Sequence, residues 1–355
     1  MRLSPLPPGL NTLADHEAHA RGVLDAAAWA YFNGGSADEV TLAENLQAWR
    51  ALRLLPRALR PLAGLTPATT LLGRALAHPV LVAPLALQRL AHPDGELATA
   101  QAAAAQGAGL VVSTQASLRL EDVAAAVRGD ADRGPLWFQL YVQADRGLTL
   151  DLVRRAEAAG YEALVVTVDA PVQAPRDAQW RAGFKVPPGL AVNLPATPAA
   201  TDLADLLRQA PTWDDIAWLR AQTRLPVVLK GLVHPDDARE ALRHGVDALI
   251  VSNHGGRALD TVPATARLLP ALAEAAGGAL PLLVDGGIRR GTDVLKALAL
   301  GARAVLVGRP VAWGLANAGA LGVAHVLRLL RDEFEVAMAL CGCERTDQIT
   351  PDLLC

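Results

Sequence analysis

The chain has 355 residues, of which 52% are hydrophobic and only 4% aromatic, with a formal net charge of -3. No block of like charges is present, so we expect neither nucleic acid nor an anionic membrane as a partner. Apolar stretches such as Pro79 to Leu87 are far shorter than a membrane span, and the first residues lack a signal-peptide core. We therefore expect a cytoplasmic protein that acts on a small molecule.

Three cysteines occur, Cys341, Cys343 and Cys355, all near the end of the chain. They cannot form a disulfide framework, which fits a reducing compartment. A metal site at Cys341 and Cys343 would need further Cys or His ligands nearby, and the local sequence offers none. We interpret these cysteines as structural and expect no metal.

The first 78 residues precede the repeating part of the chain. They include a helical stretch from Leu13 to Phe32, followed by the turn Asn33-Gly34-Gly35. We interpret residues 1–78 as an N-terminal helical extension.

Eight short apolar runs then follow one another, each ending in Gly or polar residues. Such runs predict buried parallel strands. They are Pro79 to Ala86, Gly109 to Gln115, Pro135 to Tyr141, Ala163 to Asp169, Pro226 to Gly231, Ala248 to Gly255, Pro281 to Gly287 and Ala304 to Pro310.

Helical stretches separate these runs. They include Gly95 to Gln106, Leu120 to Val127, Leu148 to Ala159, Asp214 to Gln222, Pro235 to His244, Thr261 to Ala276 and Thr292 to Leu300. Alternating strands and helices predict βαβ units, and no G-x-G-x-x-G motif follows the first strand. The sequence therefore predicts a closed (β/α)₈ barrel over residues 79–355 rather than an open doubly wound sheet.

One connection is unusually long, from Asp169 to Pro226, and residues 187–211 are rich in Pro, Ala and Thr. Long loops inside compact domains are often lids. We expect a lid-like loop around residues 170–211.

Polar side chains follow the predicted strands. They are Ser113, Gln115, Gln139, Tyr141, Thr167, Asp169, Lys230, Ser252, Asn253, His254, Arg257, Asp285, Arg289 and Arg309. Active sites of (β/α)₈ barrels lie at the carboxyl ends of the strands. A solvated rim is the alternative, but a barrel needs no such set for stability alone, so we favour an active site.

The last two strands end in VDGGIRRG (284–291) and VGRP (307–310). The glycines Gly286, Gly287 and Gly308 let backbone amides approach an anion, and Arg289 and Arg309 add permanent charge. Loops at this place in the barrel recurrently bind phosphate. We expect a phosphate-bearing ligand, which at this point is either FMN or a sugar phosphate.

The stretch IVSNHGGRALD (250–260) places His254 and Arg257 directly after a strand. A guanidinium can hold a carboxylate while an imidazole removes a proton from the neighbouring carbon or its hydroxyl. Asp169 could stabilise the imidazolium and fix its tautomer. This pattern predicts acid-base chemistry on a carboxylic acid.

Several motifs carry a family resemblance: APLALQRLAHPDGE, WFQLY, TVDAP, VLKGL, SNHGGRALD, LLVDGGIRRGTDVLKALALGA and VGRP. Over about residues 31–343 the chain resembles the FMN-dependent 2-hydroxy acid oxidases and dehydrogenases, which include glycolate oxidase, lactate oxidase and mandelate dehydrogenase. The resemblance implies FMN as cofactor and oxidation of small L-2-hydroxy acids to 2-oxo acids. It also implies a homo-oligomer, often a tetramer.

The resemblance assigns roles at matching positions. It implies that His254 is the catalytic base, Asp169 its partner and Arg257 the main clamp on the substrate carboxylate. Tyr31 resembles the tyrosine that also holds this carboxylate, and Tyr141 the one that contacts the substrate hydroxyl.

Lys230 is expected beside the flavin N1 edge, where a fixed positive charge stabilises the anionic reduced ring. An ordinary ion pair at the rim is the alternative. The further expected FMN contacts are Ala83, Pro84, Leu85, Ala86, Ser113, Gln139, Thr167, Ser252, Asp285, Gly286, Gly287, Arg289, Gly308 and Arg309.

The chain departs from the family pattern near the substrate. Arg176 is the expected second arginine of the substrate site, but Ala174 and Pro175 stiffen a turn that glycine would relax. Gln115, which we also expect to contact substrate, stands where plant glycolate oxidases have tryptophan, and Leu85 where they have threonine. The substrate therefore need not be glycolate.

The predicted lid also lacks the longer apolar or basic insertion of membrane-associated relatives, which favours O₂ as acceptor and H₂O₂ as product. Alternatives are a dehydrogenase that uses a quinone or carrier protein, or an oxidase of a larger or peptide-derived 2-hydroxy acid. An FMN-containing isomerase, an aldolase-like phosphate-binding barrel and a non-enzymatic scaffold are less favoured, because none needs this carboxylate clamp. The sequence does not decide between hydride and carbanion mechanisms.

Overall fold

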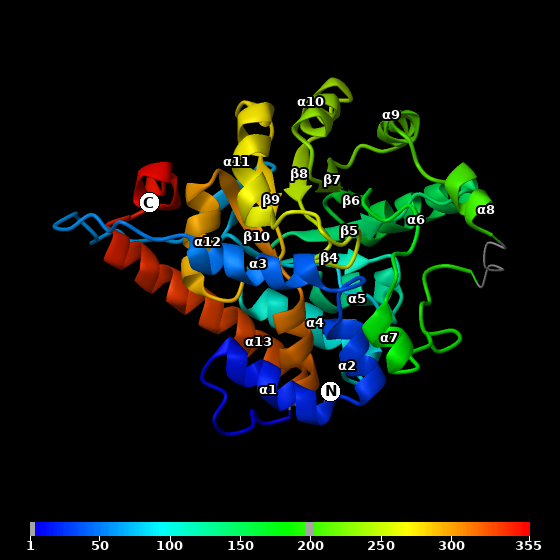
Figure 1. Cartoon of the computed structure of the whole chain (residues 1–355), viewed down its shortest axis with the longest axis horizontal. Helices are drawn as coiled ribbons and strands as arrows, with labels where there is room; N and C mark the ends of the chain where they lie inside the picture. The colour runs from blue at the N-terminus through cyan, green and yellow to red at the C-terminus, as the bar shows by residue number, and fades with distance from the viewer. Residues whose placement is uncertain (1–3, 196–201) are drawn as a thin grey trace.

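A closed barrel of eight parallel strands forms the centre of the molecule, which a computed structural model describes over residues 4–195 and 202–355 (Figure 1). Neighbours around the barrel follow the chain order, and β10 closes it by pairing with β3. The strands are β3 (Val80–Val82), β4 (Gly109–Ser113), β5 (Leu136–Leu140), β6 (Leu164–Thr167), β7 (Val227–Leu232), β8 (Ala248–Val251), β9 (Leu282–Val284) and β10 (Ala302–Val307). The predicted (β/α)₈ barrel is confirmed.

Most of the predicted strands extend too far at their carboxyl ends. For example, pairing in β8 stops at Val251, although the predicted strand runs to Gly255. The polar residues beyond each strand turn away from the ladder into loops, which is how they reach the end of the barrel.

Helices surround the barrel. They are α4 (Gly95–Ala105), α5 (Leu120–Val127), α6 (Arg146–Ala159), α9 (Trp213–Gln222), α10 (Pro235–Arg243), α11 (Thr265–Ala276), α12 (Gly291–Ala299) and α13 (Arg309–Cys341). The first seven match the predicted helices to within four residues at each end. The sequence analysis missed α13, whose backbone is interrupted at Ala318 and Gly319.

Helix α13 is long and apolar enough to cross a membrane by length and composition alone. In the structure, however, 78% of the most apolar 18-residue stretch of this helix is buried. The helix packs against α1, α4 and α12. Its apolar composition is therefore accounted for by packing within the fold.

The predicted helix from Leu13 to Phe32 is two helices, α1 (Leu13–Val23) and α2 (Ala26–Asn33). The break occurs because Leu24 is extended and the Asp25 carboxylate caps α2 by accepting from the Ala28 amide at 2.7 Å. A third helix, α3 (Val40–Ala51), was not predicted. A hairpin of β1 (Thr69–Leu71) and β2 (Arg74–Leu76) follows it, and the predicted boundary at residue 78 falls just after that hairpin.

The long connection after β6 contains two short helices, α7 (Asp177–Arg181) and α8 (Leu203–Arg208). The predicted lid-like loop is thus partly helical. Residues 196–201 of this segment lie outside the described part of the chain.

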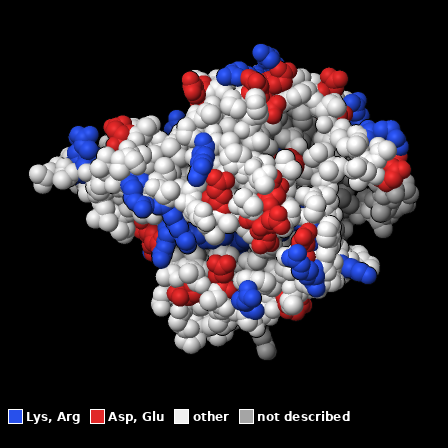
Figure 2. All heavy atoms as spheres, viewed as in Figure 1, with Lys and Arg blue, Asp and Glu red and all other residues white. Residues whose placement is uncertain are grey.

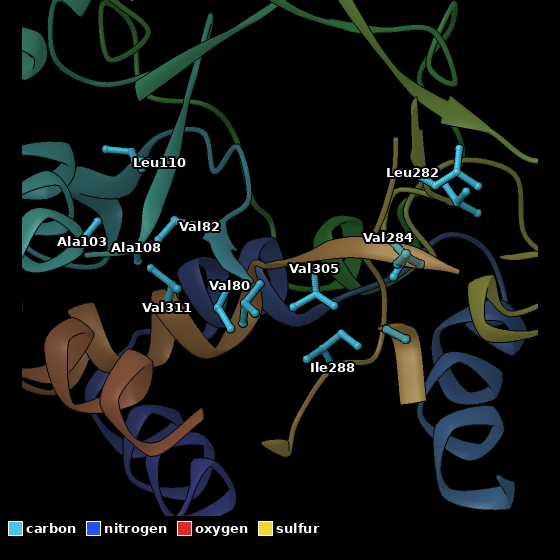
Figure 3. Packing of buried hydrophobic residues seen from close by; sticks show 14 of the residues in the cluster. Val80, Val82, Ala103, Ala108, Leu110, Leu282, Val284, Ile288, Val305 and Val311 are labelled. Carbon is cyan, nitrogen blue, oxygen red and sulfur yellow. The ribbon is translucent and has the colours of Figure 1, made fainter. Parts of the chain in front are cut away.

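Two hydrophobic layers build the core. Alternate strand residues such as Val80, Val82 and Val305 point outward toward the helices (Figure 3). Leu81 and Leu306 belong instead to the cluster that fills the barrel, which residues of β1 and β2 also join. This alternation follows from the two-residue period of a strand. On the face in Figure 2, acidic and basic side chains are interspersed.

Candidate active site

A cavity of about 860 Å³ lies at the carboxyl ends of the barrel strands. The predicted site residues that line it are Tyr31, Ala83, Pro84, Leu85, Ala86, Ser113, Gln115, Gln139, Tyr141, Thr167, Arg176, Lys230, His254, Arg257, Asp285, Gly286, Gly287, Arg289, Gly308 and Arg309. Asp169 and Ser252 lie behind this lining, where they bind residues that do face the cavity. The structure therefore gathers the predicted residues at one place.

His254 and Asp169 form a hydrogen-bonded pair in one wall. His254 Nδ1 lies 2.9 Å from Asp169 Oδ1, and the His254 amide donates to Ser252 Oγ at 3.0 Å. Burial alone would raise the pKa of Asp169, but the charges of His254 and Lys230 hold it below its usual value. The ionised carboxylate thus fixes the imidazole and leaves Nε2 as the ring nitrogen available for acid-base chemistry.

Two backbone features make this pair possible. His254 has a positive φ of 57°, which directs the chain into the turn after β8. Gly231 has a φ of +112°, and a Cβ there would lie 2.5 Å from Asp169 Cβ. A larger residue at position 231 would displace the carboxylate.

Lys230 is buried at the end of β7 within a second polar cluster. Its Nζ donates to Ser252 Oγ at 2.8 Å and lies 3.1 Å from Asp285 Oδ2. Burial opposes its charge, but the pKa of Lys230 stays above its usual value because Asp285 and Asp169 are close. The structure therefore holds a protonated amine at the cavity wall.

Arg257 and Tyr31 form a wall shared by the barrel and α2. Arg257 Nη1 donates to the backbone oxygens of Tyr31 at 2.6 Å and Gly34 at 2.9 Å. The guanidinium carbon lies 5.3 Å from the centre of the Tyr31 ring, and this ring stacks on Phe184 at 4.7 Å. Burial raises the pKa of Tyr31, so its hydroxyl remains a neutral donor.

Arg176 reaches the cavity despite the stiff residues before it. Its Nε and Nη1 are buried without a hydrogen-bond partner. Burial, followed by the nearby charge of Arg257, lowers its pKa to about 10. Tyr141 also faces the cavity, and burial and Asp169 raise its pKa to about 12. At neutral pH this region is therefore cationic and rich in donors.

The loops that follow β9 and β10 have the features of a phosphate site. Gly287 has a φ of +85°, and a Cβ there would overlap the backbone oxygen of Asn45. Arg309 opens α13 and donates to the backbone oxygens of Asn33 and Gly255 at 3.2 and 2.9 Å. Burial, with the charges of Arg257 and Arg289, lowers the pKa of Arg309 to about 9. Two buried guanidinium groups beside glycines and a helix N-terminus suit a phosphate.

Neutral polar groups from β4, β5 and β6 form another part of the cavity wall. Gln139 Nε2 donates to Thr167 Oγ1 at 3.0 Å, and Ser113 Oγ donates to Gln139 Oε1 at 3.2 Å. The Asp285 Oδ1 atom is buried without a partner. The phosphate site suits the phosphate of FMN, the unpaired Asp285 oxygen suits its ribityl chain, and the neutral wall with the buried Lys230 suits its ring. The residues present therefore fit this cofactor.

Sequence reasoning missed several lining residues of the lid segment, including Gln179, Trp180, Phe184, Val186 and Leu206. These residues do not directly follow a predicted strand, so the search for polar residues after each strand could not identify them. For Gln179 and Trp180 the available signal was their position within a few residues of Arg176, a signal that Leu206 lacks.

Within the described ranges, no group of three or more His, Cys, Asp or Glu residues could hold a metal ion. Cys341 and Cys343 are buried free thiols and Cys355 is exposed. Their interpretation as structural residues stays a prediction.

Fold and site together define a (β/α)₈ barrel built for a phosphate-bearing cofactor and a carboxylate. The model of the FMN-dependent dehydrogenase family matches residues 20–355, so the chain belongs to this family. The predicted resemblance and the FMN cofactor are confirmed.

Individual relatives cover nearly the whole chain. An L-lactate oxidase of Alicycliphilus denitrificans is 50% identical over 98% of this chain and 97% of its own. Human 2-hydroxyacid oxidase 1 is 44% identical over 98% of this chain and 97% of its own. A solved structure of mandelate oxidase with (S)-2-phenylpropionate has a TM-score of 0.88 at 45% identity, over 97% of both chains.

Proposed function

We propose that this enzyme oxidises small L-2-hydroxy acids to 2-oxo acids with FMN, and passes the electrons to O₂ to give H₂O₂. The hydrogen-bonded pair of His254 and Asp169, in the same cavity as Arg257 and Lys230, carries this proposal. The relatives named L-lactate oxidase and 2-hydroxyacid oxidase bear out the activity class.

Arg257 and Tyr31 are proposed to hold the substrate carboxylate. Two backbone oxygens already fix Arg257 Nη1, so the remaining guanidinium donors keep a set direction toward the cavity. The neutral Tyr31 hydroxyl adds one donor. A carboxylate held in this way has its C2 carbon and hydroxyl in a defined orientation.

His254 is proposed as the base that removes a proton from the substrate. Its Nδ1 is bound to Asp169, so the carboxylate stabilises the positive charge that the ring acquires. Tyr141 is proposed to contact the substrate hydroxyl, because its raised pKa keeps the phenol protonated. Gln115, which lines the cavity, is proposed as a further substrate contact.

Bound FMN would supply the two-electron acceptor for this oxidation. Arg289, Arg309 and the neighbouring glycines would hold its phosphate, and Asp285 its ribityl chain. Gln139, Thr167 and Ser113 would contact its ring, while the charge of Lys230 would stabilise negative charge there.

The runner-up proposals keep the same chemistry. One is a dehydrogenase that delivers electrons to a quinone or a carrier protein, and the other is an oxidase of a larger or peptide-derived 2-hydroxy acid. We also propose a cytoplasmic homo-oligomer, a tetramer, for which the family resemblance is the support.

Anaerobic visible spectra with a panel of L- and D-2-hydroxy acids test the proposal. We expect L-acids to bleach the flavin, and admitted air to restore its colour with release of peroxide. Bleaching that air does not reverse would identify a dehydrogenase. A flavin that no small acid bleaches would contradict the proposed activity and favour a larger substrate or an isomerase.

A further inference from the structure

Buried side-chain polar atoms without a partner are confined to one region of the described residues. They are Asp169 Oδ2, Asp285 Oδ1, Arg176 Nε, Arg176 Nη1 and Gln179 Nε2. Leaving such atoms unpaired costs free energy, so a fold tolerates them where a ligand will bind. Four of the five belong to residues already placed in the site, and Gln179 is the addition.

Gln179 lies on the short helix α7 in the lid segment. It is the only residue of this helix in the buried class, at 5% exposed, and it lines the cavity. Arg176 stands three positions before it, as the N-cap of this helix, and also lines the cavity. Arg181, at the other end of the helix, has a side chain that is 79% exposed. Arg176 and Gln179 therefore both face the cavity from this end of the lid segment.

The unpaired atoms of α7 and its N-cap are all donors. Arg176 cannot pair with the Gln179 Nε2 donor, because a guanidinium has no acceptor. The charge of Arg176 interacts with Arg257, Tyr31, Tyr141 and Asp169, and also with that of Arg309. Because four of these five partners belong to the proposed substrate site, we assign the missing acceptor to the substrate.

The substrate's reacting oxygens already have other partners. Arg257 and Tyr31 face its carboxylate in the proposed function, and His254 and Tyr141 face C2 and the hydroxyl. Donors on Arg176 and Gln179 remain in excess. They suit one more oxygen, placed on the side chain of the acid beyond C2.

We propose that Gln179 is a specificity-determining residue which, with Arg176, binds an acceptor oxygen on the substrate side chain. This inference rests on the proposed function and specifies its substrate class. The preferred substrates are L-2-hydroxy acids that carry a carboxylate or a carbonyl oxygen beyond C2.

The test compares three substrates of equal chain length: L-malate, its 4-monoamide and L-2-hydroxybutyrate. The variant Gln179→Leu keeps the approximate volume and removes the donor, and Gln179→Met replaces it if that protein does not fold. Arg181→Gln is the matched control, because Arg181 lies on the same helix with its side chain 79% exposed. Flavin absorbance reports whether each protein binds FMN.

In the wild type we expect kcat/KM for malate or its monoamide to exceed that for 2-hydroxybutyrate by about 10-fold or more. Gln179→Leu should lower the value for the acceptor-bearing acids by about 10-fold or more and leave 2-hydroxybutyrate within about twofold. A response with malate alone would identify a carboxylate as the group bound, and a response with the monoamide would identify a carbonyl oxygen.

The assignment of Gln179 would be overturned if Gln179→Leu lowered kcat/KM equally for all three substrates or for none of them. It would also be overturned if the wild type preferred 2-hydroxybutyrate. Each of these outcomes would leave the proposed function standing. A wild-type flavin that neither these acids nor L-lactate reduce would overturn both.

Discussion

The strand-end rim of the barrel and the lid segment face the same cavity, but the donors of Lys230 at the rim are paired, whereas donors in the lid segment are not. At the rim, Lys230 is paired with Asp285 and Ser252, and His254 with Asp169. In the lid, three donors of Arg176 and Gln179 have no partner. The rim is therefore preorganised, whereas the lid is completed by its ligand.

The elements that carry the two regions explain this difference. Rim side chains follow strands whose backbones are paired on both sides, so their positions are set by the barrel. Gln179 belongs to a five-residue helix inside a long connection, and Arg176 is the N-cap of this helix. Chemistry is expected to depend on the rim, and substrate binding on the lid.

The largest expected effect is at the rim. Replacing His254 with Ala removes the base, so flavin reduction should slow by about 10⁴-fold, the upper range for acid-base catalysis. Anaerobic stopped-flow absorbance measures this rate. FMN content should not change, since other residues line the phosphate end, and full activity in the variant would refute the assignment.

Lys230→Met should have the next largest effect. Loss of the fixed charge should slow flavin reduction by about 10²- to 10³-fold. The variant also leaves Asp285 buried without its cation, so Tm should fall. Lys185→Met, at an exposed lid position, is the matched control. An unchanged rate of flavin reduction would show that Lys230 serves only as a structural ion-pair partner of Asp285.

Arg176→Leu tests whether a lid residue affects substrate binding without affecting thermal stability. Because Nε and Nη1 of Arg176 are unpaired, their removal should leave Tm unchanged or raise it, unlike Lys230→Met. KM should rise by about 10-fold, because the substrate loses its partner in the lid. Steady-state kinetics and thermal melts check both effects. A marked loss of Tm would show that Arg176 is paired within the substrate-free protein.

The smallest effect is expected outside the cavity, where the buried His16 bridges α1 and α13. Its Nε2 lies 2.9 Å from His325 Nδ1, and its Nδ1 lies 3.1 Å from Asn317 Nδ2. Burial, then the nearby His325 and His19, lowers the pKa of His16 to about 4, below the value of about 6.5 in an unfolded chain. Between these values the unfolded chain binds more protons.

His16 therefore stabilises the fold fully above pH 6.5, and this stability should be lost progressively as the pH falls toward 4. Melts from pH 7.5 to 5 should show Tm falling by a few degrees more in the wild type than in His16→Asn. Equal slopes would show that His16 does not contribute. The rate of flavin reduction at pH 7.5 should be the same in both proteins.

The sequence by itself determined the barrel and most of the site. Buried runs such as Val227–Leu232 read as strands because both faces are covered, and polar residues after them had to meet at one end. Motifs around His254 and Gly287 then predicted acid-base chemistry and a phosphate-bearing ligand, and the family resemblance of these motifs implied FMN. These features are local in sequence, so they could be read without coordinates.

Only the tertiary structure decided what depends on distant contacts. Helix α13 was missed because its first half is almost entirely buried, so that part of its sequence lacks a polar face. The carbonyl oxygens that fix Arg257 come from α2, more than two hundred positions away. The unpaired amide of Gln179 is likewise visible only once α7 packs at the cavity, because burial and pairing are properties of the fold and not of the residue.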